Sequence, residues 1–316
     1  MSRIKTCMAL VLTVVMLTVC AIPAVAASDQ VLEGAISDAA DYVLKTAENP
    51  QVDSVGGEWA VFGLARSGYP VKTDYYQRYY ANVETYVKAC GGVLSDKKYT
   101  EYARVILALT ALGKDPSNVA GYNLLTPLGD YDKTIWQGIN GPIFALLALD
   151  CGQYGMPVNR QAVRQATREL YVNRILSLQL GDGGFAMSGT RADPSITAMA
   201  LQALSSYQDT ETVSRAIERA LACLSLLQNE TGGFSVNGEE NSEGVSQAIV
   251  ALGELGIPLD DDRFVKNGTS LLDNLLTYSV KGGGFRHTVG GHPDEMATEQ
   301  ALYALVSAQQ IGRAHV

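Results

Sequence analysis

The chain has 316 residues, of which 47% are hydrophobic and 18% are charged, a composition typical of a globular protein with a sizeable core. The formal net charge is −9, and loss of residues 1–26, which hold two basic residues and no acid, would make it −9 − 2 = −11. A surface this acidic disfavours nucleic acid and anionic membranes as partners. The three cysteines beyond residue 26 are too few and too scattered to form a disulfide framework.

Residues 1–26 are predicted to be a secretory signal peptide and not part of the fold. Arg3 and Lys5 precede an apolar run, and Ala24-Val25-Ala26 gives a small-x-small cleavage site. The apolar run is short for a bilayer span. The mature chain is therefore expected to have no transmembrane segment and to be secreted or held at a bacterial cell surface.

One pattern, Ala-Leu-x-Ala-Leu, recurs along the chain and is called the kernel below; Val or Ile can take its second place and Gly its fourth. A repeat of this kind marks an architecture in which similar units stack, because one unit cannot bury its apolar face alone. The six copies, at intervals of 37 to 55 residues, begin at Ala60, Ala108, Ala145, Ala200, Ala248 and Ala301.

Apolar spacing predicts helices along almost the whole chain, apart from an irregular region over 113–141. Strand signals are nearly absent. Beyond Pro157 a polar helix, a Gly-rich loop and a kernel helix alternate three times. The predicted ranges are 30–48, 58–67, 74–90, 98–112, 143–150, 159–180, 195–204, 210–229, 243–255, 260–280 and 294–309.

This pattern predicts an all-α fold over 27–310, in which six helix pairs close into an (α/α)6 double toroid. The kernel helices are the less polar members of each pair, so they are expected to form the inner ring, with their charged partners outside. Alanines spaced i, i+3 let neighbouring helices approach closely, and both Ala and Leu are strong helix formers.

Two copies of Gln-x-x-x-Gly-Gly-Phe, at 179–185 and 228–234, and a Ser-x-x-x-Gly-Gly-Phe copy at 279–285 precede kernel helices. These residues resemble the repeats of the terpene-cyclase and protein-prenyltransferase α/α-toroid superfamily, also called prenyltransferase/squalene oxidase repeats. The resemblance is strong over 158–309 and weaker over 30–157. Gly-Gly permits a turn that a Cβ would obstruct, so the motif indicates a fold and not a chemistry.

The enzymes of that superfamily are matched poorly at the positions that carry their chemistry. Squalene–hopene-type cyclases use an Asp-x-Asp-Asp-Thr segment, and the corresponding Asp193-Pro194-Ser195-Ile196-Thr197 keeps only the first Asp and the Thr. The Asp, Cys and His that hold zinc in protein prenyltransferases are not matched either. The resemblance therefore assigns no catalytic residue.

The secreted branch of the superfamily looks closer, in particular the toroid half of transcobalamin and intrinsic factor. That likeness implies a toroid that cups a bulky, corrinoid-like ligand, with a separate small domain covering the ligand. Residues 311–316 can be encoded by a sequencing adapter, so the native protein is expected to continue with at least one further domain.

A ring of candidate ligand-binding residues lies seven residues before each kernel, where parallel inner helices would gather them at one mouth of the toroid. Helix capping is the alternative role and is compatible with lining the mouth. The six positions are Asp53, Glu101, Gly138, Asp193, Asn241 and Asp294, and all of them except Gly138 carry a polar or acidic side chain and are site candidates.

Further candidates lie in the first turns of the kernel helices or in the segments that enter them. Aromatic, amide and acidic side chains together suit a bulky polar ligand or a sugar, although an isolated tryptophan is as often a core residue. These candidates are Trp59, Tyr102, Trp136, Asn140, Glu243, Glu295 and Glu299. His287 and His292, with Asp294, give only weak support for a metal, so no metal or cofactor is expected.

The sequence thus predicts a secreted or cell-surface binding or structural module without enzymatic activity, which holds a small-molecule or glycan ligand at the mouth. One alternative is a cyclase or prenyltransferase-like enzyme on isoprenoid substrates, with Asp193 or Asp294 as the acid. The other is a purely architectural surface-layer module. A deep aromatic cavity beside a buried acid would favour the cyclase, an open acidic bowl the binder, and a filled centre the architectural role.

Overall fold

The computed structural model describes residues 22–236 and 238–314, and the side chains of 30–236 and 238–311. Most of the predicted signal peptide, residues 1–21, lies outside the described residues, and α2 (Ile22–Thr46) begins within its last part. Across the described ranges, no helix has the length and apolar character that a membrane span requires.

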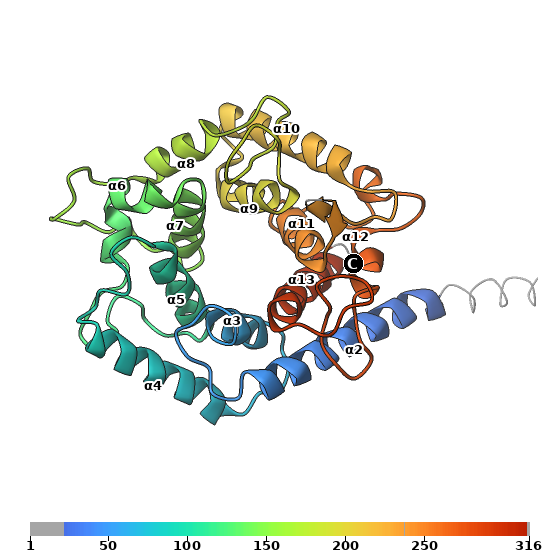
Figure 1. Ribbon diagram of the computed structural model, residues 1–316, viewed down its shortest axis with the longest axis horizontal. Coiled ribbons are helices and arrows are strands. Elements are labelled where there is room, and N and C mark those ends of the chain that lie inside the picture. The colour runs from blue at the N-terminus through green and yellow to red at the C-terminus, as the bar shows by residue number, and fades with distance from the viewer. Residues whose placement is uncertain (1–21, 237, 315–316) are drawn as a thin grey trace, which may run out of the picture.

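Six inner helices form a closed ring around a central axis (Figure 1). Each packs against the next in chain order, and the last packs against the first, so the ring is complete. The predicted (α/α)6 double toroid is therefore confirmed. The inner helices are α3 (Glu58–Arg66), α5 (Thr100–Ala111), α7 (Asn140–Asp150), α9 (Pro194–Leu204), α11 (Ser242–Glu254) and α13 (Glu295–Ala314).

The outer layer is less regular than the inner ring. Besides α2, it contains α4 (Thr73–Ala89), α8 (Arg168–Leu176), α10 (Glu211–Leu227) and α12 (Leu271–Leu276). Between α5 and α7 the outer position is filled by the single turn α6 (Tyr131–Thr134) and two short 3-10 helices, Thr126–Gly129 and Ile135–Gln137, as the Pro- and Gly-rich sequence predicted. In the described ranges the only sheet is a hairpin of β1 (Ser235–Val236) and β2 (Glu239–Glu240).

The kernels hold the ring together because their small residues lie at the helix contacts. The first alanine of every kernel is at most 1% exposed, and the Leu or Ile side chains at the second and fifth kernel places of α7, α9, α11 and α13 are fully buried behind them. Packing at this density leaves no room for larger side chains at the contacts. The repeated sequence pattern is thus the contact surface between neighbouring inner helices.

The Gly-Gly-Phe motifs join outer to inner helices. Phe185 and Phe234 are fully buried and Phe285 is 1% exposed, so each aromatic ring fills a gap between helices. A Cβ on Gly184 would lie 2.4 Å from the Cβ of Ala192, so only glycine fits there. In the first two copies the leading Gln donates to two backbone carbonyls, as in the 2.8 Å bond from Gln179 Nε2 to the oxygen of Gly183.

Two outer helices are much shorter than the sequence suggested. The predicted helix over 260–280 is broken by a turn at Asn267-Gly268, where both residues have positive φ (50° and 78°), and only α12 remains helical beyond it. Asn-Gly is a strong turn signal. The helix predicted over 159–180 begins only at Arg168, because the Thr167 side chain caps it by accepting from the Leu170 N–H.

Candidate functional site

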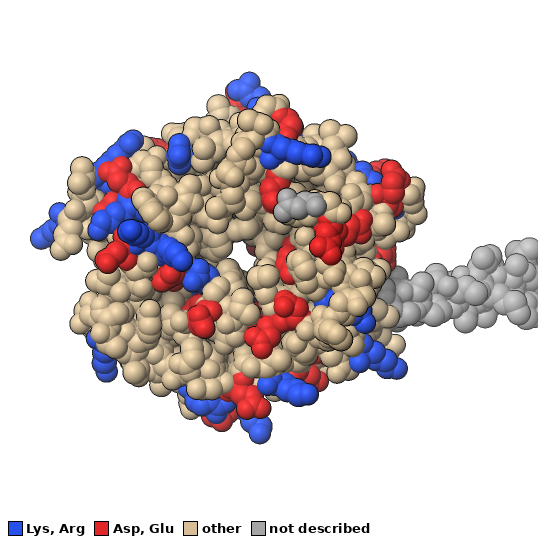
Figure 2. Space-filling model, in the orientation of Figure 1, with Lys and Arg blue, Asp and Glu red and all other residues tan. Residues whose placement is uncertain are grey.

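A cavity of about 720 Å³ runs along the axis of the inner ring and is called the bore below. Figure 2 shows an opening at the centre of the molecule, with acidic side chains gathered beside it over α11 and α13. Two positions of the repeat line the bore, the residue just before the kernel and the third residue of the kernel, with Thr110 on α5 as the exception. Those that reach the bore are Trp59, Phe62, Leu107, Phe144, Leu147, Met199, Gln202, Gln247, Val250, Gln300 and Tyr303.

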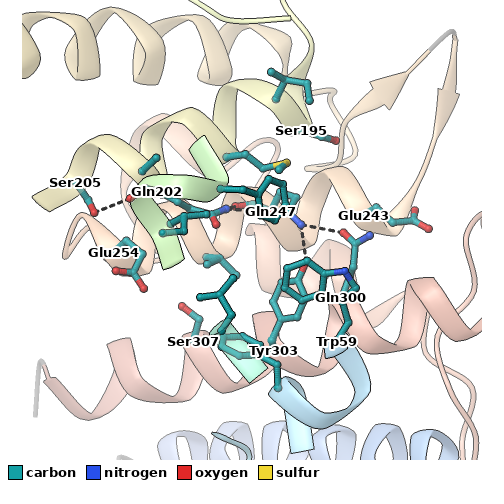
Figure 3. Close-up of a pocket in the computed structure, with 18 of the residues that line it drawn as sticks. Trp59, Ser195, Gln202, Ser205, Glu243, Gln247, Glu254, Gln300, Tyr303 and Ser307 are labelled. Carbon is teal, nitrogen blue, oxygen red and sulfur yellow. Dashed lines mark hydrogen bonds between the residues drawn. The ribbon is translucent and has the colours of Figure 1, made fainter. Parts of the chain in front are cut away.

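The bore extends along most of the length of the inner helices. On α11, Glu243, Gln247, Val250 and Glu254 all line it, and this spacing places them along one face of the helix. Eleven residues separate the two glutamates, which is about 16 Å of helix. Figure 3 shows them at opposite ends of the cavity. Glu243 marks the amino-terminal mouth and Glu254 the carboxyl-terminal mouth.

Aromatic side chains of α3 and α7 form one side of the bore, which we call the aromatic wall (Trp59, Phe62 and Phe144). The ring centroid of Trp59 lies 6.1 Å from those of both Phe62 and Phe144. Tyr303, on α13, lies 6.0 Å from Trp59 and 6.1 Å from Phe62, so it joins the wall to the opposite side. Such clustered rings offer a flat apolar surface to a ligand.

Three glutamines on α9, α11 and α13 form a hydrogen-bonded chain, which we call the amide ladder (Gln202, Gln247 and Gln300; Figure 3). Gln202 Nε2 donates to the backbone oxygen of Gln247 at 3.1 Å and to its Oε1 at 3.0 Å. Gln247 Nε2 then donates to Gln300 Oε1 at 2.9 Å and to the hydroxyl of Tyr303.

The direction of the amide ladder is fixed by chemistry. The backbone oxygen of Gln247 can only accept, so the nitrogen of Gln202 must face it. This places Gln247 Oε1 toward Gln202 and Gln247 Nε2 toward Gln300 and Tyr303. Burial raises the pKa of Tyr303, so its hydroxyl remains protonated at neutral pH.

The charged groups along the bore are mostly acidic. Asp150, Asp193, Glu243 and Glu254 line it, against Arg66 as the single Lys or Arg among the lining residues. Asp150 is neutralised from outside, because Arg168 Nε lies 2.8 Å from its carboxylate. Glu243 is paired with His287, and burial raises the pKa of Glu254 while the charge of Arg66 lowers it. Asp193 forms no ion pair among the described residues, so the amino-terminal mouth keeps a negative charge, which favours neutral or cationic ligands.

His287 forms an ion pair with Glu243 at the amino-terminal mouth. Its Nδ1 lies 2.8 Å from both carboxylate oxygens, and its backbone oxygen accepts from the Ser242 N–H. The hydrogen bond to Glu243 raises the pKa of His287, partial burial lowers it, and the charges of Asp294 and Glu239 raise it further. This pair fixes the loop between α12 and α13 against the start of α11.

The pKa of His287, followed by NMR titration of its imidazole, is expected to lie above the usual value of about 6.5 and to return toward it in Glu243→Gln. A raised folded-state pKa means that the pair stabilises the protein fully below about pH 6.5, and that this contribution is lost as the pH rises through the raised pKa. Because the chain also contains His292 and His315, the resonance of His287 is assigned by its loss in His287→Asn, and His292→Asn serves as the control. An unchanged His287 pKa in Glu243→Gln would contradict the pairing.

Three members of the predicted ring are helix caps. The side chains of Asp193, Asn241 and Asp294 accept from the N–H groups of Ile196, Gly244 and Ala297 at 2.8–2.9 Å. Asp193 and Asn241 also line the bore. At these two positions, therefore, capping and lining of the mouth coincide.

Of the twelve predicted site residues, Trp59, Asp193, Asn241 and Glu243 line the bore. Tyr102 is 2% exposed and its hydroxyl accepts from the Leu94 N–H, which is a packing role. Trp136 is 61% exposed on the outside, beside Lys97. The structure places these residues away from the bore: Asp53, Glu101, Tyr102, Trp136, Asn140, Asp294, Glu295 and Glu299.

Glu299 is a buried acid near the amino-terminal mouth, 2% exposed. Its Oε1 accepts from the Gly56 N–H at 2.8 Å. Burial raises the pKa of Glu299 to about 8. The hydrogen bond from Gly56 lowers this pKa, and the negative charges of Glu295 and Glu58 raise it. Glu299 is therefore largely protonated at neutral pH, although it does not border the bore.

Among the described side chains, no three His, Cys, Asp or Glu residues are grouped so that they could hold a metal ion. His287 is instead engaged by Glu243. Sequence analysis did not identify the amide ladder, Phe62, Phe144 or Tyr303 as site residues. Their signal was the kernel itself, whose variable third position and preceding residue face the axis.

No family model and no curated protein matches the sequence. Solved structures do match it. Unsaturated glucuronyl hydrolase from Bacillus sp. GL1 aligns with a TM-score of 0.57 and 15% identity over 87% of this chain and 96% of its own. A structure described as UGL with dGlcA-Glc-Rha-Glc aligns with a TM-score of 0.51 and 15% identity over 88% and 96%.

A terpene cyclase is also similar: ent-copalyl diphosphate synthase from Streptomyces platensis aligns with a TM-score of 0.50 and 16% identity. The alignment covers 81% of this chain and 50% of the synthase, so the chain spans about half the length of that enzyme. At these identities the similarity concerns the fold. The chain is a mostly helical α/α toroid, the fold of its structural neighbours.

Proposed function

We propose that the protein is a ligand-binding toroid that takes a neutral molecule into its bore. The observation that carries this proposal is the pairing of two unlike surfaces across an open cavity, the aromatic wall on one side and the amide ladder on the other. Concave sites with apolar lining and a few convergent polar groups are the usual form of small-molecule sites. An open bore also argues against a purely architectural role.

The charges of the bore narrow the ligand class. A diphosphate or a glucuronyl group would meet Asp193 and the Glu243–His287 pair at one mouth and Glu254 at the other, and Arg66 is the only Lys or Arg in the described lining. Like charges in such a confined site are repelled. The ligands named for the structural neighbours are therefore poor candidates in their charged forms.

Cyclisation of an uncharged isoprenoid is the second candidate, because the aromatic wall would suit an apolar chain and Glu299 is a protonated acid nearby. The segment that carries the acids in squalene–hopene-type cyclases argues against this candidate. There Asp193 caps α9 and is followed by Pro194 and Ser195, with no second acid to tune it.

Secretion remains part of the proposal, supported by the signal-peptide pattern of residues 1–26. A bulky, corrinoid-like ligand would rest on the amino-terminal mouth and enter the bore only in part. In that case a further domain beyond this chain would cover the exposed part of the ligand.

Tryptophan fluorescence tests the bore directly, because one of the two tryptophans lies in the bore and the other on the outer surface. In Trp136→Phe the remaining Trp59 reports on the bore, and in Trp59→Phe the remaining Trp136 reports on the outer surface. A panel of neutral oligosaccharides, squalene and geranylgeranyl diphosphate is titrated into both variants. Cyanocobalamin binding is followed by equilibrium dialysis of Trp136→Phe and of Val250→Trp, in which an indole would fill the middle of the bore.

A neutral ligand is expected to change the emission of Trp59 and to leave that of Trp136 unchanged. Cyclic products from squalene, detected by gas chromatography and mass spectrometry, would establish the second candidate instead. The proposed function is wrong if no member of the panel changes Trp59 emission and Val250→Trp binds cyanocobalamin as well as Trp136→Phe does.

A further inference from the structure

The amide ladder leaves hydrogen-bonding groups free at both of its ends. Both hydrogens of Gln202 Nε2 and both of Gln247 Nε2 are used within the ladder. Among the bonds of the described residues, Gln202 Oε1 accepts none and Gln300 Nε2 donates none. Neither atom is sealed from the cavity, since neither belongs to the buried unpartnered atoms.

The two free ends differ in kind because the ladder has a direction. The α9 end offers an acceptor, Gln202 Oε1, and the α13 end offers donors, Gln300 Nε2 and the Tyr303 hydroxyl. The Gln247 amide separates them. A single hydroxyl cannot reach both ends, whereas a secondary amide carries an N–H and a C=O that point in opposite directions.

The rest of the bore indicates what such an amide would be attached to. Opposite the ladder lies the aromatic wall, which suits the apolar face of a sugar ring. Ser195 and Asn241 at one mouth, and Ser307 and Gln310 at the other, supply partners for hydroxyl groups. A bore about 16 Å long favours a short linear chain over a single ring.

We infer, on the basis of the proposed function, that the ligand is a neutral N-acetylated oligosaccharide whose acetamido group bridges the free ends of the amide ladder. The carbonyl oxygen accepts from Gln300 Nε2 and the Tyr303 hydroxyl. The amide N–H donates to Gln202 Oε1, and the sugar ring rests on Trp59.

Calorimetric titration with three trisaccharides tests the role of the acetamido group. Triacetylchitotriose carries it, cellotriose has a hydroxyl in its place, and the deacetylated chitosan trimer has a free amine. Triacetylchitotriose is expected to bind at least about tenfold more tightly than cellotriose, since one buried amide forms two or more hydrogen bonds. A chitosan trimer that binds as tightly would show that charge, not the amide, is recognised and would overturn the inference.

Two conservative variants test the ladder itself. Gln300→Met removes the donors of the α13 end, and Tyr303→Phe removes the hydroxyl while the ring remains. Each is expected to weaken triacetylchitotriose about tenfold and to leave cellotriose unchanged, so that the preference for the acetamido sugar is lost. Gln208→Met, on an exposed glutamine outside the bore, is the matched control.

A further ligand, N-acetyl-trialanine amide, distinguishes recognition of the sugar from recognition of the amide group, because it carries amides but no sugar. Tight binding of this peptide in the bore without binding of triacetylchitotriose would overturn the sugar assignment. If all amide ligands fail while another neutral ligand changes Trp59 emission, the inference is wrong and the proposed function stands. Equal losses for both trisaccharides in the Gln300 and Tyr303 variants would likewise overturn it.

Discussion

Val250→Trp is expected to abolish ligand binding without unfolding the protein. Val250 is the third residue of its kernel and lines the bore on α11, so an indole in its place would project into the cavity and fill its middle. The bore provides room for the larger side chain, which a packed core would not. Calorimetry is expected to show a loss of affinity of more than about 100-fold, or about 2.7 kcal/mol.

The matched control is Val163→Trp, which places the same side chain at a 96% exposed position outside the bore. This control should bind normally. Circular dichroism and thermal melting establish that both variants are folded. Normal binding by folded Val250→Trp would place the ligand site elsewhere on the molecule.

Phe234→Ala is expected to lower the free energy of unfolding by about 3–5 kcal/mol, because it leaves a cavity under a fully buried ring. Domains are stable by only about 5–15 kcal/mol, so this single change would remove a large share of the total. Phe234 fills the gap between an outer and an inner helix at the second Gly-Gly-Phe motif. Urea unfolding monitored by circular dichroism measures the effect.

Leu226→Ala provides the comparison, since Leu226 lies on the neighbouring outer helix α10 and is 86% exposed. It is expected to change stability by no more than about 0.5 kcal/mol. Similar losses in both variants would show that the Gly-Gly-Phe motif does not anchor the toroid.

The inner ring was the most predictable part of the fold. Kernel alanines such as Ala200 and Ala248 carry a packing requirement that recurs unchanged in every repeat, so the sequence alone shows it. The outer helices vary because they pack on one side only. The Asn267-Gly268 turn that interrupts the last of them was present in the sequence, but the helical apolar spacing around it masked it.

The lining of the bore was only partly predictable from the sequence. Two of the predicted positions seven residues before a kernel, Asp193 and Asn241, line the bore, as does Glu243 in the first turn of its helix. Helix caps and first turns are gathered at one mouth of the ring. The same spacing from the kernel also selected Glu101 and Asp294, which lie at equivalent heights but not on the face toward the bore. Distance along a helix gives the height of a residue in the ring and not the direction of its side chain.

The amide ladder is not predictable from the kernel pattern. Gln202, Gln247 and Gln300 occupy positions that vary from repeat to repeat, so the recurring pattern does not include them. In a closed toroid those variable positions are the ones that face the axis. Only the curvature of the ring, which needs all six repeats together, reveals that the three glutamines meet.

The crystal structure of the protein soaked with triacetylchitotriose and, in parallel, with the other neutral ligands of the panel tests most directly whether the bore is the binding site. Ordered ligand density is expected between Trp59 and the amide ladder, along the axis of the ring. Density confined to the outer helices, or a bore filled by the protein's own side chains, would contradict a site at the centre of the toroid.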